Sequence, residues 1–287
     1  MYGTSKRLRW TKAAPEHRSA GVTALRVVPV TPVGLRRDNR RMTETTATLL
    51  YTLAFATIVW GGWLWRSQRI VALQWALMAA SAMATLSSLK LLDLHLLLKP
   101  IPMLVAMIFV ATRASATGGF GKKDVLLLAA LLFSLGGDVF LMLPGNYFIP
   151  GLASFLVAHL FYIVLFRQGI PWFASRQGLL AVLGFGGAMY AILWSHLPDP
   201  VLAGAVGAYV TVISLMASQA IGRAKVLGTR DARWVAAGTC IFMASDSLIA
   251  INKFLTPIPL EGLWILITYF AAQFLIVHFM RAGRQTA

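Results

Sequence analysis

The stretch FSLGGDVFLMLPGNYFIPGLASFLVAHLFY, residues Phe133 to Tyr162, is apolar for most of its length and is interrupted once, at Pro144-Gly145-Asn146. The segments on either side of this interruption are long enough to predict two membrane-spanning helices. They contain one acid, Asp138, and one imidazole, His159. Because an ionisable group in hydrocarbon costs at least about 2.5–3.5 kcal/mol on insertion scales, it needs a partner or a function there. Asp138 is therefore the first candidate functional residue.

The composition extends this membrane interpretation to the rest of the chain. Hydrophobic residues make up 58% and charged residues 13%, and the mean hydropathy is +0.71, which excludes an ordinary soluble domain. About nine apolar segments are of membrane-spanning character: 45–64, 70–89, 100–113, 125–143, 147–166, 178–194, 201–220, 234–251 and 263–280. None has the alternating polarity of a barrel strand. We predict an all-α, polytopic transmembrane helical bundle.

A second acid repeats the pattern around the first. Gly136-Gly137-Asp138 and Ala244-Ser245-Asp246 both place two small residues directly before an aspartate, and small residues allow a second helix to approach closely. Each aspartate precedes the predicted end of its helix by six residues, which is about 9 Å along the axis. If the spans alternate, both acids lie in the same leaflet, and Lys99 opens another span from that side. These three groups form a candidate site.

The basic residues predict the orientation. Beyond residue 41, thirteen Lys and Arg fall in loops on one side of the predicted spans, and three, Lys90, Lys99 and Lys253, on the other. The positive-inside rule therefore predicts a cytoplasmic C-terminus. Nine spans would then place residues 1–41, with ten Lys and Arg against two acids, outside. Because this conflicts with the rule, either one span is miscounted or the arm is not part of the natural protein. We favour the second interpretation, with Met42 as the natural start and residues 1–41 as an arm that is disordered or absent in the cell, not a nucleic-acid-binding surface.

Metal-binding patterns are weak. The single cysteine, Cys240, lies within an apolar segment, and the five histidines lack the short spacings of zinc motifs. We therefore predict neither a metal site nor a cofactor. Tyr209, Tyr269 and Gln273 also lie within predicted spans, where we expect interhelical hydrogen bonding in place of chemistry.

The sequence resembles the YhhN/TMEM86 family of integral membrane lysoplasmalogenases. The residues that carry this resemblance are Lys99-Pro100, Gly137-Asp138-x-x-Leu141, the longer motif Phe148-x-x-Gly151-Leu152-x-x-Phe155-x-x-x-His159-x-x-Tyr162, and Ser245-Asp246-Ser247. The resemblance covers roughly residues 70–280. It implies an eight-span catalytic domain over 70–287, with residues 42–69 as an extra transmembrane helix.

The resemblance implies hydrolysis of the vinyl ether bond of lysoplasmalogens, a class of lysophospholipid, in the membrane. The products would be a fatty aldehyde and glycerophosphoethanolamine or glycerophosphocholine. Such a reaction needs one carboxylic acid to protonate carbon and one carboxylate to stabilise charge and activate water, and two buried acids hold different protonation states. Asp138 and Asp246 are the predicted pair. The predicted substrate-binding residues are Lys99, His159, Tyr162, Asn146 and Ser245, with Lys99 on the phosphate or tuning the pair and His159 orienting a carboxylate or water.

Other functions remain open from the sequence alone. A related lysolipid or ether lipid would suit the same pocket. A metal-dependent membrane amidase of the ceramidase type would need several histidines on facing spans, and a proton-coupled lipid or solute transporter would also use buried acids. We expect a bacterial cell-membrane protein, and the sequence gives no prediction of oligomeric state.

Overall fold

The computed structural model describes residues 81–83, 85, 95–116 and 118–280, and these residues form helices and connecting turns without a strand. The named helices are α3 (His95–Leu98), α4 (Ile101–Ala116), α5 (Lys122–Met142), α6 (Phe148–Phe166), α7 (Arg176–Trp194), α8 (Pro200–Leu227), α9 (Arg230–Phe254) and α10 (Glu261–Phe279). The predictions for residues 1–41 and for the span near 45–64 lie outside this part of the chain, as does most of the span near 70–89.

Seven helical segments of the described residues are long and apolar enough to cross a membrane. They correspond to α4 with its preceding turn and to α5 through α10, and each overlaps one of the segments predicted from hydropathy. The all-α, polytopic prediction is therefore confirmed, and the chain is an integral, multi-pass membrane protein.

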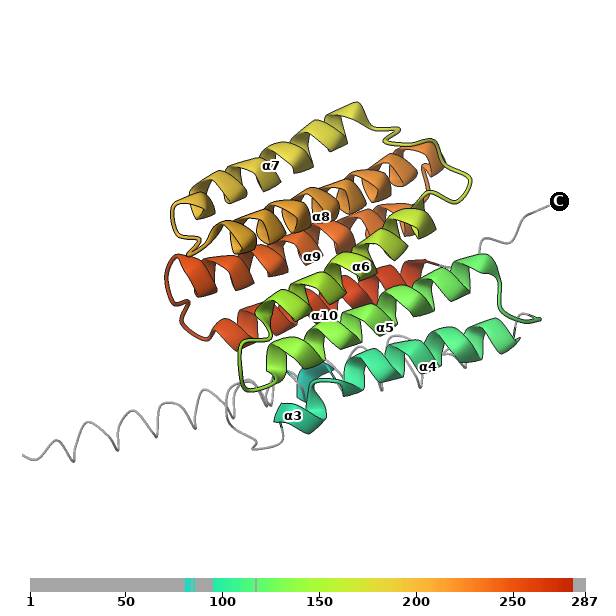
Figure 1. The fold of residues 1–287 in the computed structure, drawn as a ribbon. Coiled ribbons are helices and arrows are strands. Elements are labelled where there is room, and N and C mark those ends of the chain that lie inside the picture. Colours follow the sequence, from blue (N-terminus) through green and yellow to red (C-terminus); the bar gives the residue numbers. More distant parts are fainter. Residues whose placement is uncertain (1–80, 84, 86–94, 117, 281–287) are drawn as a thin grey trace, which may run out of the picture. The chain divides into compact units, whose positions relative to one another are not determined.

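The helices form a bundle in which sequence neighbours mostly pack together. α9 lies along α10, α5 along α6, and α8 contacts α6, α7 and α9. Figure 1 shows α7, α8 and α9 side by side, with α4 and α5 on the opposite side and α6 and α10 between them. Residues from α5, α6, α8, α9 and α10 therefore all face the middle of the bundle.

Glycines beside the first acid permit the close contact between α5 and α6. A β-carbon built on Gly137 would lie 2.4 Å from the Phe155 ring, and one on Gly136 would lie 2.7 Å from Ser154 Oγ. The helices reverse direction at the predicted interruption, where Gly145 has φ of +130°, a conformation that side-chain-bearing residues rarely adopt. The prediction that small residues bring a second helix close to Asp138 is confirmed.

The end of α8 differs from its prediction. Hydropathy predicted that this span stops at residue 220, but the helix continues to Leu227 and ends at Gly228, which has φ of +64°. The extra turns carry polar and basic residues, so they lower the hydropathy without interrupting the helix. Hydropathy detects the membrane boundary, whereas the left-handed glycine ends the helix.

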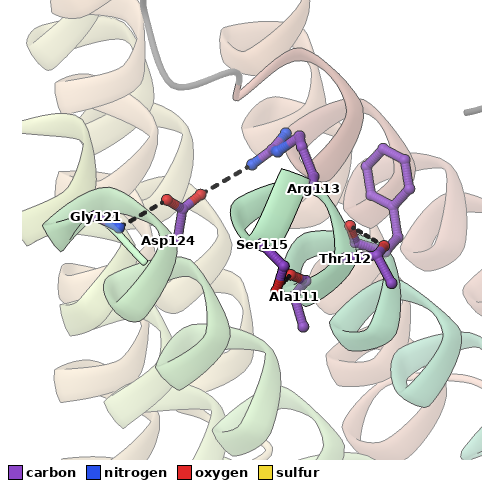
Figure 2. Close-up of polar contacts among 7 residues, drawn as sticks. Ala111, Thr112, Arg113, Ser115, Gly121 and Asp124 are labelled. Carbon is purple, nitrogen blue, oxygen red and sulfur yellow. Dashed lines mark hydrogen bonds and ion pairs between the residues drawn. The ribbon is translucent and has the colours of Figure 1, made fainter. Parts of the chain in front are cut away.

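An ion pair joins α4 to the start of α5 (Figure 2). Asp124 Oδ1 lies 3.4 Å from Arg113 Nη2, and Asp124 Oδ2 accepts a hydrogen bond of 3.1 Å from the Gly121 backbone N–H. Asp124 is the third residue of α5, where an acid also interacts favourably with the positive end of the helix dipole. This carboxylate therefore fixes both the start of α5 and its contact with α4.

Candidate functional site

Asp138 lies in the buried core at the contact between α5 and α10. Its side chain is 3% exposed, and its Oδ2 accepts a hydrogen bond of 2.7 Å from the Tyr269 hydroxyl on α10. Lys99, in the turn before α4, is near enough to act electrostatically on the carboxyl group. Two of the three groups predicted to converge, Lys99 and Asp138, are therefore brought together by α4 and α5.

Asp246 forms a second pair of the same kind between α9 and α8. Its Oδ2 accepts a hydrogen bond from the Tyr209 hydroxyl of α8. The Asp246 residue is half-buried, whereas Tyr209 is buried. Asp138 and Asp246 are close enough to interact electrostatically. The bundle thus places two aspartate–tyrosine pairs near each other, each pair joining two helices.

A row of aromatic rings connects the two pairs. The Tyr269 ring packs against Phe242 with 5.4 Å between centroids, Phe242 against His159 with 5.0 Å, and His159 against Tyr209 with 5.2 Å. The Phe155 ring packs edge-on against both Phe242 and Tyr269. The rings hold the tyrosine hydroxyl groups in position and exclude bulk water from the space between the two acids.

His159 lies within this row and is fully buried. Neither of its ring nitrogens has a hydrogen-bond partner among the described residues. A buried polar group without a partner costs about 1–3 kcal/mol. The imidazole therefore has unused hydrogen-bonding capacity beside Tyr209.

An apolar pocket opens among α5, α6, α7, α8 and α9. Its lining is almost entirely aliphatic and aromatic, and the polar residues in it are Tyr209, Asp246 and Ser247. The apolar lining residues include Leu141, Phe148, Leu152, Phe155, Phe185, Met189, Leu193, Val206, Ile213, Met243 and Phe254. Asp138 does not line it. The pocket is suited to a hydrocarbon chain, with one carboxyl group presented to that chain.

None of the five predicted substrate-binding residues lines this pocket, and three of them have other contacts or lie at the surface. Asn146 is exposed in the turn between α5 and α6. The buried Ser245 donates a hydrogen bond of 3.1 Å to the Ile265 carbonyl oxygen of α10. The Tyr162 hydroxyl donates to Gln273 Oε1 at 2.6 Å, so it ties α6 to α10. The structure therefore gives Ser245 and Tyr162 helix-joining contacts and leaves Asn146 at the surface.

Tyr209 and Tyr269 were predicted only as interhelical hydrogen-bonding residues. They do join helices, but each does so through one of the two candidate acids. Tyr269 is followed four residues later by Gln273, which donates to Ser134 Oγ of α5 at 3.2 Å. Two polar residues one helical turn apart within an apolar span indicate a face turned toward other helices. That spacing is the signal that could have identified Tyr269, whereas Tyr209 has no such companion.

Metal-ligand candidates do not cluster in the part of the chain that the structure describes, where no group of three His, Cys, Asp or Glu side chains is placed to hold an ion. The two aspartates each have a tyrosine as the hydrogen-bond partner instead.

Comparison with known proteins places this arrangement in a family. The sequence profile of the YhhN family matches residues 94–280. Lysoplasmalogenase TMEM86A of Homo sapiens is 36% identical over 159 residues, which are 52% of this chain and 62% of that protein. The lysoplasmalogenase of Mycobacterium tuberculosis is 31% identical over 239 residues, or 78% of this chain and 85% of that protein. The chain thus covers less than two thirds of the human relative, and no solved structure matches it. The chain belongs to the YhhN family.

Proposed function

We propose that this protein is a membrane lysoplasmalogenase, which hydrolyses the vinyl ether bond of a lysoplasmalogen to a fatty aldehyde and a glycerophospho-base. The observation that carries the proposal is an apolar pocket within the helical bundle that presents the Asp246 carboxyl group, with a second carboxyl group, Asp138, close behind it. The relatives named as lysoplasmalogenases support the same reaction.

The pocket suits the single hydrocarbon chain of a lysolipid. Its lining is apolar apart from Tyr209, Asp246 and Ser247. A hydrocarbon chain is already out of contact with water in the bilayer, so moving it into this pocket would change its hydration little. The vinyl ether is the first group of that chain, next to the glycerol. With the chain in the pocket, the reactive double bond would lie beside the polar residues.

The acid–base steps follow from the positions of the two acids. We assign Asp246 as the proton donor because it lines the pocket. Its proton goes to the vinyl carbon remote from the ether oxygen, and the double-bond electrons form the new C–H bond. The adjacent carbon becomes part of an oxocarbenium ion, which the neighbouring carboxylates stabilise. Water attacks that carbon and gives up a proton to a carboxylate, and the resulting hemiacetal breaks its C–O bond to release aldehyde and the glycerol hydroxyl.

The groups around the pair would support these steps. The unpartnered nitrogens of His159 lie on a ring packed against Tyr209, which borders the pocket, so we assign to His159 the role of holding the attacking water. Lys99 acts electrostatically on Asp138, which favours its predicted role in tuning the pair over a role in phosphate binding. Tyr209 would keep the Asp246 carboxyl group in one orientation, and restricting the geometry in this way accelerates a reaction.

The orientation of the bundle supports a location for the chemistry. The basic loops favour a cytoplasmic C-terminus. Asp138 and Asp246 both lie nearer to the C-terminal ends of α5 and α9, which are the ends away from the basic loops. The site would then lie in the leaflet away from the cytoplasm. Because the mycobacterial relative is bacterial, we keep the bacterial cell membrane as the proposed location.

The proposal is tested by measuring aldehyde release from lysoplasmenyl-ethanolamine by detergent-purified protein. We expect release by the wild type, and a loss of about 10²- to 10⁴-fold in Asp246→Asn and in Asp138→Asn, the range typical of a missing acid or base. Asp199→Asn is the matched control. Asp199 caps the start of α8 by accepting a hydrogen bond from Leu202 N–H, and asparagine caps helices equally well.

The outcomes separate the reaction from its mechanism. A folded wild type that releases no aldehyde from this lipid would overturn the proposed reaction and favour another lysolipid or ether lipid. Aldehyde release that persists in both aspartate variants would leave the reaction in place and remove the acid pair. Equal loss in Asp199→Asn would attribute the effect to the fold.

A further inference from the structure

Lys253 lies beside the pocket at the end of α9. Its ammonium nitrogen is 4.6 Å from the centroid of the Phe148 ring and 5.9 Å from that of Phe254. Both rings line the pocket, while Lys253 itself is exposed. Stacking on these rings contributes about 0.5–1 kcal/mol at an exposed site. The ammonium group is therefore more stable over the aromatic rings at the edge of the pocket than extended into solvent.

No carboxylate neutralises this charge within the described residues. The ion pair found there, Arg113 with Asp124, involves other helices. Lys99, the other described lysine at this end of the bundle, acts on Asp138. Lys253 therefore presents an available positive charge next to an apolar pocket, an arrangement that matches a molecule with a hydrocarbon chain and an anionic headgroup.

The spacing between Asp246 and Lys253 matches the dimensions of such a molecule. Asp246 and Lys253 are seven positions apart on an uninterrupted helix, so their Cα atoms lie on the same face, about 10 Å apart along its axis. In a lysophospholipid with a vinyl ether, five bonds separate the ether oxygen from the phosphorus, which is about 6 Å at ordinary covalent bond lengths. The flexible four-carbon stem of Lys253 can bring the ammonium to a phosphate oxygen while the vinyl ether lies beside Asp246.

We propose that Lys253 binds the phosphate of the lysolipid while the chain occupies the pocket and the reactive group lies at Asp246. The reaction at Asp246 rests on the proposed function, whereas the phosphate contact stands on the pocket and on the position of the ammonium. Lys253 is thus a substrate-binding residue, and it selects lipids whose anionic group lies a fixed distance from the chain.

Binding of a non-hydrolysable ligand tests this proposal independently of the reaction. Two probes are compared in detergent micelles: a saturated alkyl-ether lysophosphoethanolamine, and the corresponding alkylglycerol, which lacks the phosphate. Lys253→Gln is expected to weaken binding of the phosphate-containing probe about tenfold, the size of a lost charge-assisted hydrogen bond, and to leave alkylglycerol binding unchanged. Lys253→Arg is expected to bind both probes within about twofold of wild type because it keeps the charge and the stacking.

Lys225→Gln is the matched control, since it removes an exposed lysine from the last turn of α8. Equal binding of both probes by wild type and Lys253→Gln would overturn the proposal, as would equal weakening of both probes, which indicates damage to the pocket. Aldehyde release by the same preparations is measured separately. A wild type that binds the phosphate probe through Lys253 but releases no aldehyde would count against the reaction alone.

Discussion

The two aspartate–tyrosine pairs have the same chemistry and different surroundings. Asp138 with Tyr269 is sealed in the core, where the aspartate is 3% exposed. Asp246 with Tyr209 borders the apolar pocket. A motif of two small residues followed by an aspartate thus indicates a close helix contact in both places, but only one of the two acids borders the pocket. The comparison assigns different roles to two similar motifs.

Removing one tyrosine hydroxyl from each pair gives the sharpest test of this difference. Tyr209→Phe is expected to lower kcat about 10- to 100-fold, because its hydrogen bond orients the proposed proton donor and a misplacement of a reacting group by about 1 Å can cost as much. Tyr269→Phe is expected to lower the unfolding free energy by about 1–3 kcal/mol, because it leaves a buried carboxyl oxygen without its donor. Both kcat and the thermal unfolding midpoint are measured for each variant.

Tyr190→Phe serves as the control for these two variants. The Tyr190 hydroxyl donates to the Ala203 carbonyl oxygen at 2.9 Å, so its loss removes an interhelical hydrogen bond that involves no acid. We expect a loss of about 0.5–1.5 kcal/mol in stability and little change in kcat. If Tyr209→Phe and Tyr269→Phe changed activity and stability in the same proportion, the division between the pairs would fail.

A smaller effect is expected from the glycine beside Asp138. In Gly137→Ala the new methyl group would meet the Phe155 ring at 2.4 Å, and that ring is held between Phe242 and Tyr269. Overpacking of this kind costs about 1–3 kcal/mol, and the displaced ring lines the pocket, so activity should fall with stability. Unfolding midpoints and aldehyde release measure the two effects.

Gly184→Ala is the matched substitution for Gly137→Ala. A β-carbon on Gly184 meets no atom within 4 Å, so alanine there should be neutral or stabilise α7 by up to about 1 kcal/mol. A Gly137→Ala protein as stable and active as Gly184→Ala would contradict the close approach of α5 and α6.

The smallest effect is expected at the ion pair drawn in Figure 2. Asp124→Ala removes the contacts with Arg113 and with the Gly121 backbone N–H, which should lower the unfolding free energy by about 1 kcal/mol. The value of kcat should stay within about twofold, because this carboxylate lies at the opposite end of α5 from Asp138. A loss of kcat as large as that of Tyr209→Phe would show that the contacts at the start of α5 also affect the geometry around Asp138 and Asp246.

Sequence patterns predicted the helices better than the contacts between them. The spans of the described region were recognisable because hydropathy is a local property, and Asp138 and Asp246 were recognisable because acids are costly in hydrocarbon. The partners of those acids were not, since Tyr269 is 131 positions from Asp138 and the rotation of each helix decides which residue it meets. Asn146 is part of the predicted helix interruption beside the motif, and it lies exposed in the turn, so its nearness to Asp138 in sequence did not predict its position.

Residues two positions apart on one helix can also have unrelated environments. Ser245 bonds to the α10 backbone, whereas Ser247, two positions later, lines the pocket. Successive helical residues are about 100° apart around the axis, so proximity to Asp246 in sequence does not decide access to the pocket. The sequence could place both serines near the acid but could not determine which one faces the substrate.

The continuity of α9 from Arg230 to Phe254 fixes the backbone spacing between Asp246 and Lys253, the two residues proposed to meet the substrate. Asp246 and Lys253 belong to one rigid rod, so tilting the helix moves both groups together and leaves the separation between them unchanged. Only a change of position by whole turns keeps a residue on the same face, and each turn is about 5.4 Å. Selectivity for substrate length along this axis would therefore change in discrete steps, through relocation of a charge by three or four positions, and not through gradual adjustment of side chains.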